Sequence, residues 1–311
     1  MVGTVIVRDG DVIGEGWHVE LGGLHAERAA LEDCEDPSGA TMYVTLEPCA
    51  HQGRQPPCVD AILEAGISRV VIASDDPSEK AAGRGPGILR DGGVEVEFAA
   101  GKEAAAARLL NQPFRKHART GLPLVTLKMA MSMDGRFATP PGESQWISGE
   151  RSRELVHRWR AEHDAIAVGI GTVLADDPLL TTRIPDARQP IRVVFDRHAR
   201  LPLDSQLLRT LDQSPLIVVV SPEADATALR EAGAEILVAD GIHAALADLG
   251  RRNITSLFLE GGPTLAAAFA EASEIDETRT FVAPILLTSS ERQAALNVTD
   301  DTLITARFKE W

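Results

Sequence analysis

Short apolar runs alternate with helix-like stretches along the first 115 or so residues. Residues 4–7 and 12–16 flank the turn dipeptide Asp9-Gly10, and this arrangement predicts a β-hairpin. Further strands are predicted at 41–46, 69–73 and 94–98, and helices at 25–31, 58–65, 87–90 and 102–117, the last rich in alanine. Strands that alternate with helices in this way indicate a layered α/β domain.

The same alternation continues after a Gly- and Pro-containing stretch at residues 120–123. Strands are predicted at 124–129, 165–169, 191–196, 216–220, 235–238, 254–259, 279–287 and 302–308, and helices at 150–161, 225–232, 242–250 and 263–271. A length of 311 residues suits two domains. We therefore predict one α/β domain over residues 1–119 and a second over residues 120–311.

The composition indicates the class of protein and its cellular compartment. Apolar residues make up 44% of the chain and charged residues 25%, as in ordinary globular proteins. No apolar run approaches the ~20 residues that span a bilayer. The apolar start of the chain soon meets Arg8, Asp9 and Gly10, unlike a signal peptide. These features predict a cytoplasmic protein without a membrane partner.

The chain is acidic, with 31 Lys and Arg against 46 Asp and Glu, a formal charge of −15. Both predicted domains share this excess of acidic residues. Nucleic-acid binding depends largely on Lys and Arg that neutralise phosphates, so the charge argues against a nucleic-acid partner. A small phosphorylated ligand would need a local cluster of cations that acts against the overall field.

One histidine and two cysteines have the spacing of a zinc site. His25-Ala26-Glu27 opens a predicted helix, Pro48-Cys49 follows a strand, and Cys58 follows the next loop. Three such ligands leave a fourth zinc position for water, and Glu27 can move the proton of that water to a leaving ammonia. His-x-Glu followed by Pro-Cys is the signature of zinc deaminases, although here eight residues instead of two separate the cysteines.

Two alternatives for these residues stay open: a histidine and cysteines that are simply packed in the core, and a structural zinc. A structural zinc would need a fourth protein ligand, for which Cys34 is the remaining thiol. We expect Cys34 instead to be a small buried apolar residue. An odd number of cysteines without a secretion signal makes a disulfide framework improbable.

The second predicted domain contains two features suited to phosphates. Gly261-Gly262 lies between an apolar strand and an alanine-rich helix, where backbone N–H groups can approach a pyrophosphate. Arginine is also concentrated in residues 151–160, at positions 151, 153, 158 and 160, against the single acidic residue Glu154. We expect Arg151 and Arg153 to form a solvated helix face.

The stretch around the cysteines supports a narrower assignment. Residues 47–58 (EPCAHQGRQPPC) and 76–85 (DPSEKAAGRG) resemble the pyrimidine deaminases of riboflavin biosynthesis, in which Thr is usual at the place of Gln55. The resemblance implies a three-layer, cytidine-deaminase-like domain with His25, Cys49 and Cys58 on zinc and Glu27 as the catalytic residue. We expect Arg54, Lys80 and Arg84 to bind the 5′-phosphate of the substrate.

The second half resembles the reductase that accompanies this deaminase in a bifunctional family. The matching stretches are 127–136 (LKMAMSMDGR), 142–148 (GESQWIS), 171–183 (GTVLADDPLLTTR) and 260–265 (EGGPTL). The resemblance implies a dihydrofolate-reductase-like α/β domain that uses NADPH. By resemblance, the cofactor-binding residues are Ala130, Trp146, Thr172, Asp176, Gly262, Pro263, Thr264, Leu265, Ala266, Ala267 and Ala268, and the substrate-binding residues are Ser144, Arg160, Leu180, Arg183 and Glu260.

The resemblance implies two successive reactions on one phosphorylated pyrimidine, in an enzyme expected to form homo-oligomers. The first removes the 2-amino group of 2,5-diamino-6-ribosylamino-4(3H)-pyrimidinone 5′-phosphate, and the second reduces the ribosyl chain of 5-amino-6-(5-phosphoribosylamino)uracil to ribityl. The family begins with a helix and an Asn-Pro turn before Val2, whereas this chain starts at Met1 inside that motif. The alternatives are a reductase with a truncated, inactive deaminase half, a zinc deaminase acting on nucleic acid, and a scaffold without activity.

Overall fold

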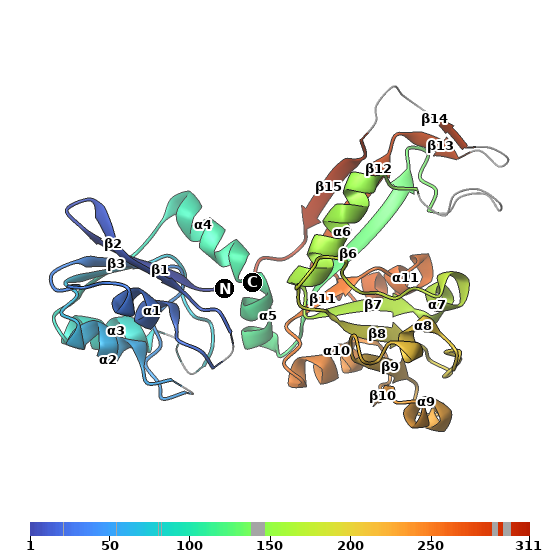
Figure 1. Ribbon diagram of the computed structural model, residues 1–311, viewed down its shortest axis with the longest axis horizontal. Helices are drawn as coiled ribbons and strands as arrows, with labels where there is room; N and C mark the ends of the chain where they lie inside the picture. The colour runs from blue at the N-terminus through green and yellow to red at the C-terminus, as the bar shows by residue number, and fades with distance from the viewer. Residues whose placement is uncertain are drawn as a thin grey trace. The chain divides into compact units, whose positions relative to one another are not determined.

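The chain folds into two units, shown in the computed structural model of Figure 1. The structure describes residues 1–20, 22–53, 55–79, 81, 83–137, 147–287, 292–294 and 300–311. Unit 1 comprises Met1–Thr120 together with Trp311, and unit 2 comprises Gly121–Glu310. Within the described residues, no helix is both long and apolar enough to cross a membrane.

Unit 1 is built on a five-stranded sheet of order β2-β1-β3-β4-β5. Its strands are β1 (Gly3–Arg8), β2 (Asp11–Trp17), β3 (Thr41–Val44), β4 (Arg69–Ile72) and β5 (Glu95–Phe98). The predicted hairpin is confirmed, because β1 and β2 pair antiparallel on either side of Asp9 and Gly10, both with positive φ. β3, β4 and β5 pair in parallel, as connections through helices require.

Three helices cover one face of this sheet: α1 (Ala26–Glu32), α2 (Cys58–Glu64) and α3 (Arg84–Asp91). Their apolar side chains join those of the strands in a core that includes Ala30, Met42, Ile62, Val70 and Leu89. Cys34 is buried in this core, as expected.

The single helix predicted over 102–117 is wrong. The structure has two helices here, α4 (Gly101–Leu110) and α5 (Gln112–Thr120), which meet at Asn111. Pro113 explains the break, because its ring would clash with the carbonyl of Leu109 and its nitrogen cannot donate to that carbonyl. Proline is tolerated in the first turn of a helix, so the chain restarts as α5 in a new direction.

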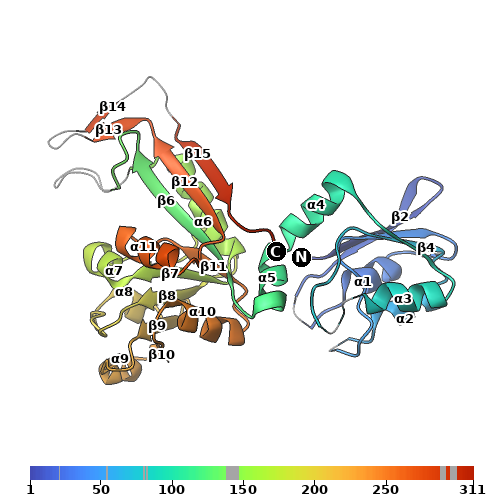
Figure 2. The same cartoon turned by 180° about the vertical axis from the view of Figure 1, so that it is seen from behind.

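Unit 2 is built on an eight-stranded sheet of order β10-β9-β8-β7-β11-β6-β12-β15. Its strands are β6 (Leu124–Ser132), β7 (Ala165–Gly169), β8 (Ile191–Phe195), β9 (Leu216–Val220), β10 (Glu235–Val238), β11 (Ser256–Leu259), β12 (Glu277–Ala283) and β15 (Thr302–Arg307). β15 pairs antiparallel with β12, whereas the other pairs are parallel. The long strands β6, β12 and β15 lie side by side in Figure 2.

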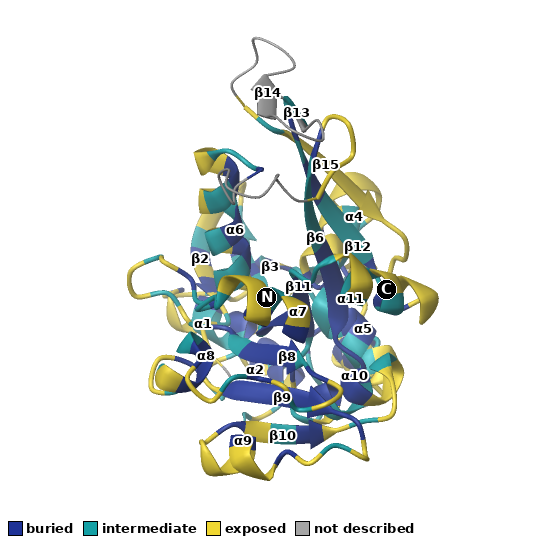
Figure 3. Ribbon diagram, turned by 90° about the vertical axis from the view of Figure 1, so that its right-hand side faces the viewer, coloured by how far each residue is buried: buried dark blue, intermediate teal, exposed yellow. Residues whose placement is uncertain are grey.

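Helices cover both faces of this sheet. One core contains side chains of α6 (Glu150–Glu162), α7 (Ile170–Asp176), α8 (Gln206–Arg209) and α9 (Thr227–Glu231), and the other contains side chains of α10 (Ile242–Arg251) and α11 (Pro263–Glu271). The interior strands β8 and β9 are accordingly buried along most of their length (Figure 3). These layers confirm the predicted α/β class for both units.

Two details of unit 2 differ from the expected elements. The strand predicted over 279–287 is divided into β12 and β13 (Ile285–Leu287), and β13 pairs instead with β14 (Arg292–Ala294). Pro284 stands at the division, where it cannot donate to a sheet ladder. The short helices α7 and α8 were not predicted.

His163, at the end of α6, makes the stability of unit 2 depend on pH. Burial lowers the pKa of His163 to about 4 from 6.5. The unfolded chain therefore takes up a proton that the native unit excludes as the pH falls from 6.5 to 4. We expect the free energy of unfolding to fall by about 3 kcal/mol over this interval and to recover above pH 6.5. Thermal unfolding of the wild type and of His163→Asn tests this, and equal pH slopes would contradict it.

Candidate zinc centre and reductase cavity

Three elements of unit 1 bring the predicted zinc ligands together. His25 is the N-cap of α1, Cys49 lies in the loop after β3, and Cys58 is the first residue of α2. α1 packs directly on β2 because β2 has glycine at the contact: a Cβ on Gly16 would lie 2.7 Å from the carbonyl oxygen of Ala26. This close approach fixes the height of His25 above the sheet.

The geometry of these residues fits zinc. His25 Nδ1 lies 3.5 Å from Cys49 Sγ and 3.3 Å from Cys58 Sγ, and the ligand atoms of all three lie within 4.8 Å of one another. Tetrahedral zinc, with bonds of about 2.1 Å to nitrogen and 2.3 Å to sulfur, spaces such atoms about 3.6 Å apart. Three protein ligands leave one position open, which is typical of a catalytic site.

The surroundings of Cys49 favour a thiolate, whereas the hydrogen bond with Cys49 and burial raise the pKa of Cys58. Hydrogen bonds from Cys58 and His25 lower the pKa of Cys49 to about 4, although burial opposes this. The backbone N–H of Cys58 donates to Cys49 Sγ at 3.3 Å. The hydrogen bond to Cys49 also raises the pKa of the His25 imidazole. A metal ligand must be deprotonated, so the loop prepares Cys49 for that role.

Glu27 lies in the first turn of α1, two residues after His25, and is 4% exposed. Burial raises the pKa of its carboxyl to about 7, and the nearby Cys49 acts in the same direction. A carboxyl with this pKa can both accept and release a proton near neutral pH, which is what general acid–base catalysis requires.

Glu47 is a buried residue of this site that the sequence reasoning did not single out. Its carboxylate accepts a hydrogen bond from the backbone N–H of Gly83 at 2.9 Å. Burial raises the pKa of Glu47, and backbone hydrogen bonds from Asp76, Gly83 and Gly85 act against this shift. Glu47 therefore connects Asp76, Gly83 and Gly85 to the segment that carries Cys49. Its place directly before Pro48-Cys49 was the available signal.

Of the three cations predicted to bind the 5′-phosphate, the structure describes Arg84. Arg84 is exposed at the first position of α3, where helical N–H groups also favour an anion. Arg54 and Lys80 lie outside the described residues. Their contribution to a phosphate site therefore stays a prediction.

Unit 2 contains a cavity of about 1090 Å³ at the carboxyl ends of its central strands. Parallel α/β sheets bind ligands at this edge, and the volume exceeds that of a typical drug-sized site. Nine of the predicted site residues line the cavity: Ala130, Arg160, Thr172, Asp176, Arg183, Glu260, Gly262, Pro263 and Ala266. Thr264, Leu265, Ala267, Ala268 and the buried Leu180 are not among its lining residues, and Ser144 and Trp146 lie outside the described residues.

Arg160 and Glu260 form a paired charge inside this cavity. Arg160 Nε and Nη2 donate to the two carboxylate oxygens of Glu260 at 2.7 and 3.0 Å, and Arg160 Nη1 donates to the Thr181 carbonyl at 3.0 Å. Burial alone would raise the pKa of Glu260, but Arg160 and, to a smaller extent, Lys128 outweigh it, so the pKa lies below its usual value. The Glu260 carboxyl group is therefore ionised near neutral pH.

The two glycines after β11 and the start of α11 form one side of the cavity. Gly262 is the N-cap of α11 and Pro263 its first residue, so a helix start, which favours a phosphate, borders the cavity. A Cβ on Gly261 would lie 3.0 Å from Leu265, which leaves little room for a side chain there. These features fit the pyrophosphate of a dinucleotide.

Other cavity residues were not assigned to the site from the sequence, and three of them carry a cation or an imidazole close to the predicted site. Lys128 and His157 both line the cavity, and burial lowers the pKa of each. Arg153 also lines it and donates to the Ser148 carbonyl at 2.7 Å, so the expectation of a solvated face is wrong for Arg153. Arg151 is exposed and pairs with Asp300, as expected of a surface residue. Lys128 was visible in the sequence as a lone cation within an apolar strand.

Comparison with known proteins assigns a family to both units. Residues 123–306 match the family model of the RibD C-terminal domain, and residues 1–74 match that of the cytidine and deoxycytidylate deaminase zinc-binding region. The riboflavin biosynthesis protein RibD of Actinobacillus pleuropneumoniae is 44% identical over 296 residues, which cover 92% of this chain and 78% of that protein. The chain belongs to the RibD family.

Other relatives and solved structures agree. The RibD of Escherichia coli is 39% identical and covers 94% of this chain and 83% of its own length. The structure of Acinetobacter baumannii RibD has a TM-score of 0.84 at 40% identity, covering 96% of this chain and 83% of that one. The diaminohydroxyphosphoribosylaminopyrimidine deaminase/5-amino-6-(5-phosphoribosylamino)uracil reductase of Thermotoga maritima has a TM-score of 0.86 at 33% identity, with 98% and 91% covered.

These matches confirm the expected fold and chemistry. Unit 1 is cytidine-deaminase-like and unit 2 is a RibD reductase domain. The protein is a bifunctional enzyme, a deaminase and a reductase, with zinc and NADPH as cofactors. The alternative of a reductase alone is not favoured, since the deaminase model matches with its His, Cys and Cys cluster intact.

Proposed function

We propose that this enzyme carries out two consecutive steps of riboflavin biosynthesis. Residues 1–119 would deaminate 2,5-diamino-6-ribosylamino-4(3H)-pyrimidinone 5′-phosphate, and residues 120–311 would reduce the ribosyl chain of 5-amino-6-(5-phosphoribosylamino)uracil to ribityl with NADPH. The observation that carries the proposal is that one chain contains both sites. One is a three-ligand zinc site with an open position beside a buried carboxyl group, and the other is a cavity bordered by glycines that contains Arg160 and Glu260.

In the deaminase step, Glu27 would act as the proton carrier. Zinc held by His25, Cys49 and Cys58 would supply a Lewis acid that lowers the pKa of water. With its raised pKa, Glu27 can accept a proton from water and deliver it to the leaving amine, so ammonia departs as a neutral molecule. Burial excludes bulk water from this transfer.

In the reductase step, NADPH would supply the hydride, and the protein would orient the two reactants. Gly262, Pro263 and Ala266 at the start of α11 would hold the cofactor, together with Ala130, Thr172 and Asp176 of the same cavity. Arg160, Glu260 and Arg183 would bind the substrate, together with Ser144 and Leu180. Arg183 has a planar guanidinium suited to a phosphate ester, and it lines the same cavity.

We further propose that the substrate phosphate is recognised locally against an acidic background. Arg54, Lys80 and Arg84 would bind it in the first domain, and Arg160 and Arg183 in the second. A formal charge of −15 disfavours nucleic acid as a partner. We also propose a cytoplasmic location and assembly into homo-oligomers.

A two-step assay on the diaminopyrimidine phosphate tests the proposal. Without NADPH, we expect the enzyme to release ammonia and accumulate the deaminated pyrimidine. With NADPH, we expect oxidation of the cofactor to follow ammonia release after a lag. NADPH oxidation on the deaminated compound without any ammonia release from the diamino compound would contradict the proposed deaminase.

Removal of zinc is expected to separate the two activities. A chelator should abolish ammonia release, because the three ligands lie in unit 1 alone, and leave NADPH oxidation on the deaminated substrate within about twofold of its starting rate. Zinc content and both rates should be measured on the same sample, and added zinc should restore ammonia release. Loss of both rates together would show that the metal supports more than the deaminase.

A further inference from the structure

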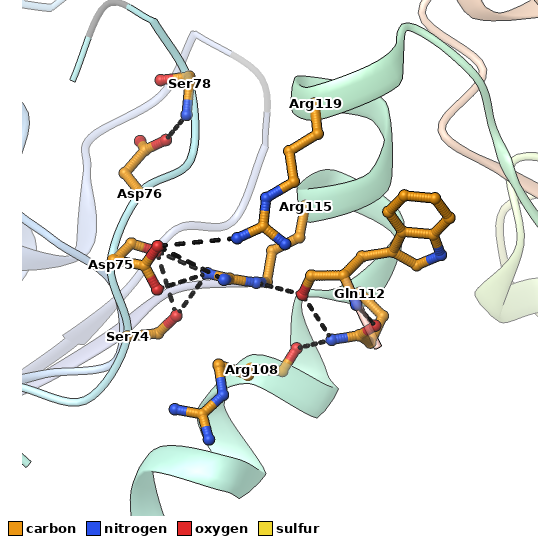
Figure 4. A network of polar contacts seen from close by, with 9 residues as sticks. Ser74, Asp75, Asp76, Ser78, Arg108, Gln112, Arg115 and Arg119 are labelled. Atoms are coloured by element: carbon orange, nitrogen blue, oxygen red, sulfur yellow. Dashed lines mark hydrogen bonds and ion pairs between the residues drawn. The ribbon is translucent and has the colours of Figure 1, made fainter. Parts of the chain in front are cut away.

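Helix α5 contains a buried cation that is distant in sequence from the zinc ligands. The Arg115 side chain is 3% exposed. Its Nη1 donates to Ser74 Oγ at 2.9 Å and to the Asp75 carbonyl at 2.7 Å, and it lies 3.0 Å from the Asp75 carboxylate. Figure 4 shows the guanidinium reaching from α5 to the turn that follows β4.

Trp311 completes the contacts of this guanidinium within unit 1. Arg115 Nε donates to the Trp311 carbonyl at 2.5 Å. The side-chain amide of Gln112 donates to the same carbonyl at 3.0 Å and accepts from the Trp311 N–H at 2.7 Å. Lys116 lies 5.5 Å from the centre of the indole ring. Arginine can fix several acceptors at once only when its planar donors are matched in this way.

The turn held by Arg115 is connected to the zinc centre by backbone hydrogen bonds. The ladder between β3 and β4 continues beyond both strands: Ala73 N–H donates to the Val44 carbonyl at 2.9 Å, and Glu47 N–H donates to the Ser74 carbonyl at 2.9 Å. Cys49 follows Glu47 by two residues, through Pro48. The position of the Ser74 carbonyl therefore sets where the segment with Cys49 leaves the sheet.

We propose that Arg115 is a positioning residue of the deaminase, which acts by fixing the Ser74-Asp75 turn and through it the Glu47–Cys49 segment. The inference rests on the proposed deaminase function. A metal site tolerates errors of only about 0.5 Å in its ligands, and supporting hydrogen bonds provide that precision. Arg115 is suited to this task because burial leaves its guanidinium no alternative partner in water.

Arg119 provides a matched control on the same helix. It lies one turn after Arg115 and also faces Asp75, but at 3.9 Å and with 39% of its side chain exposed. Exposed ion pairs contribute little, so Arg119→Ala changes the same charge on the same helix without loosening the turn.

The test uses the full chain, in which the reductase is an internal control for the folding of unit 2 and full metal occupancy is the control for unit 1. For Arg115→Ala, we expect kcat/KM for ammonia release to fall about tenfold, mainly through kcat, with reductase kcat within about twofold of wild type. Cobalt substituted for zinc should show shifted d–d absorption bands at full occupancy, which reports ligand geometry without substrate. Arg119→Ala should match the wild type in both measurements.

Ser74→Ala is a milder variant that removes one acceptor of Arg115 and keeps the charge. It should shift the cobalt bands in the same direction and lower deaminase kcat about threefold, about 0.65 kcal/mol at 25 °C. Wild-type cobalt bands and deaminase kcat in either folded variant would overturn the proposal. If the wild-type enzyme itself releases no ammonia, the proposed function fails, and the cobalt spectra still decide the role of Arg115.

Discussion

Replacement of Glu27 by Gln is expected to lower ammonia release about 1000-fold or more and to leave NADPH oxidation on the deaminated substrate unchanged. Glutamine keeps the shape of the side chain but cannot carry a proton between water and the leaving amine, and proton transfer of this kind contributes about 10²- to 10⁴-fold. Glu27 is buried beside the zinc ligands in unit 1, whereas the reductase cavity is lined by residues of unit 2.

Zinc content and a second variant make this result specific. Glu27→Gln should retain zinc, since His25, Cys49 and Cys58 supply the ligands. Glu27→Asp keeps the acid but shortens it by one methylene, and should restore only part of the activity if position matters as well as charge. Ammonia release by Glu27→Gln at near the wild-type rate would remove Glu27 from its proposed role. A parallel loss of NADPH oxidation would argue against two separate sites.

The zinc centre was predictable from the sequence because its residues stand at the starts and ends of local elements. His25 and Glu27 open one helix and Cys58 opens another, so short-range patterns placed them, and the loop motif of residues 47–58 added the family. The hairpin at Asp9-Gly10 was predictable for the same reason. Local sequence determines both a turn and the residue at a helix start.

Contacts across the chain were not predictable in this way. The ion pair of Arg160 and Glu260 joins residues 100 positions apart, and the Arg115 contact to Ser74 spans 41. Periodicity marks a buried face but does not say which distant element covers it, so Arg153 was wrongly expected on a solvated face. The break at Asn111 shows a different failure: alanine content outweighed Pro113 in the prediction of one long helix.

Loss of Arg160 is expected to impair the reductase by one route, the loss of a substrate contact, and to destabilise unit 2 by another, the unpaired carboxylate of Glu260. Arg160→Met should lower kcat/KM for NADPH oxidation about 100-fold, because it removes a proposed substrate contact and leaves the Glu260 carboxylate without its bidentate partner. The side chains are 16% and 10% exposed, so the unpaired carboxylate should cost about 3 kcal/mol of unfolding free energy. Ammonia release should stay within about twofold of wild type.

The double variant Arg160→Met/Glu260→Gln distinguishes the two routes. Glutamine removes the unpaired charge with little change in volume, so the double variant should recover most of the lost stability. It should not recover NADPH oxidation, since both proposed substrate contacts are then altered. Denaturant unfolding and steady-state rates on the wild type, both single variants and the double variant complete the cycle. If the double variant is as unstable as Arg160→Met, the cost comes from lost packing of the arginine stem and not from the carboxylate; if it regains NADPH oxidation, neither side chain is needed for substrate binding.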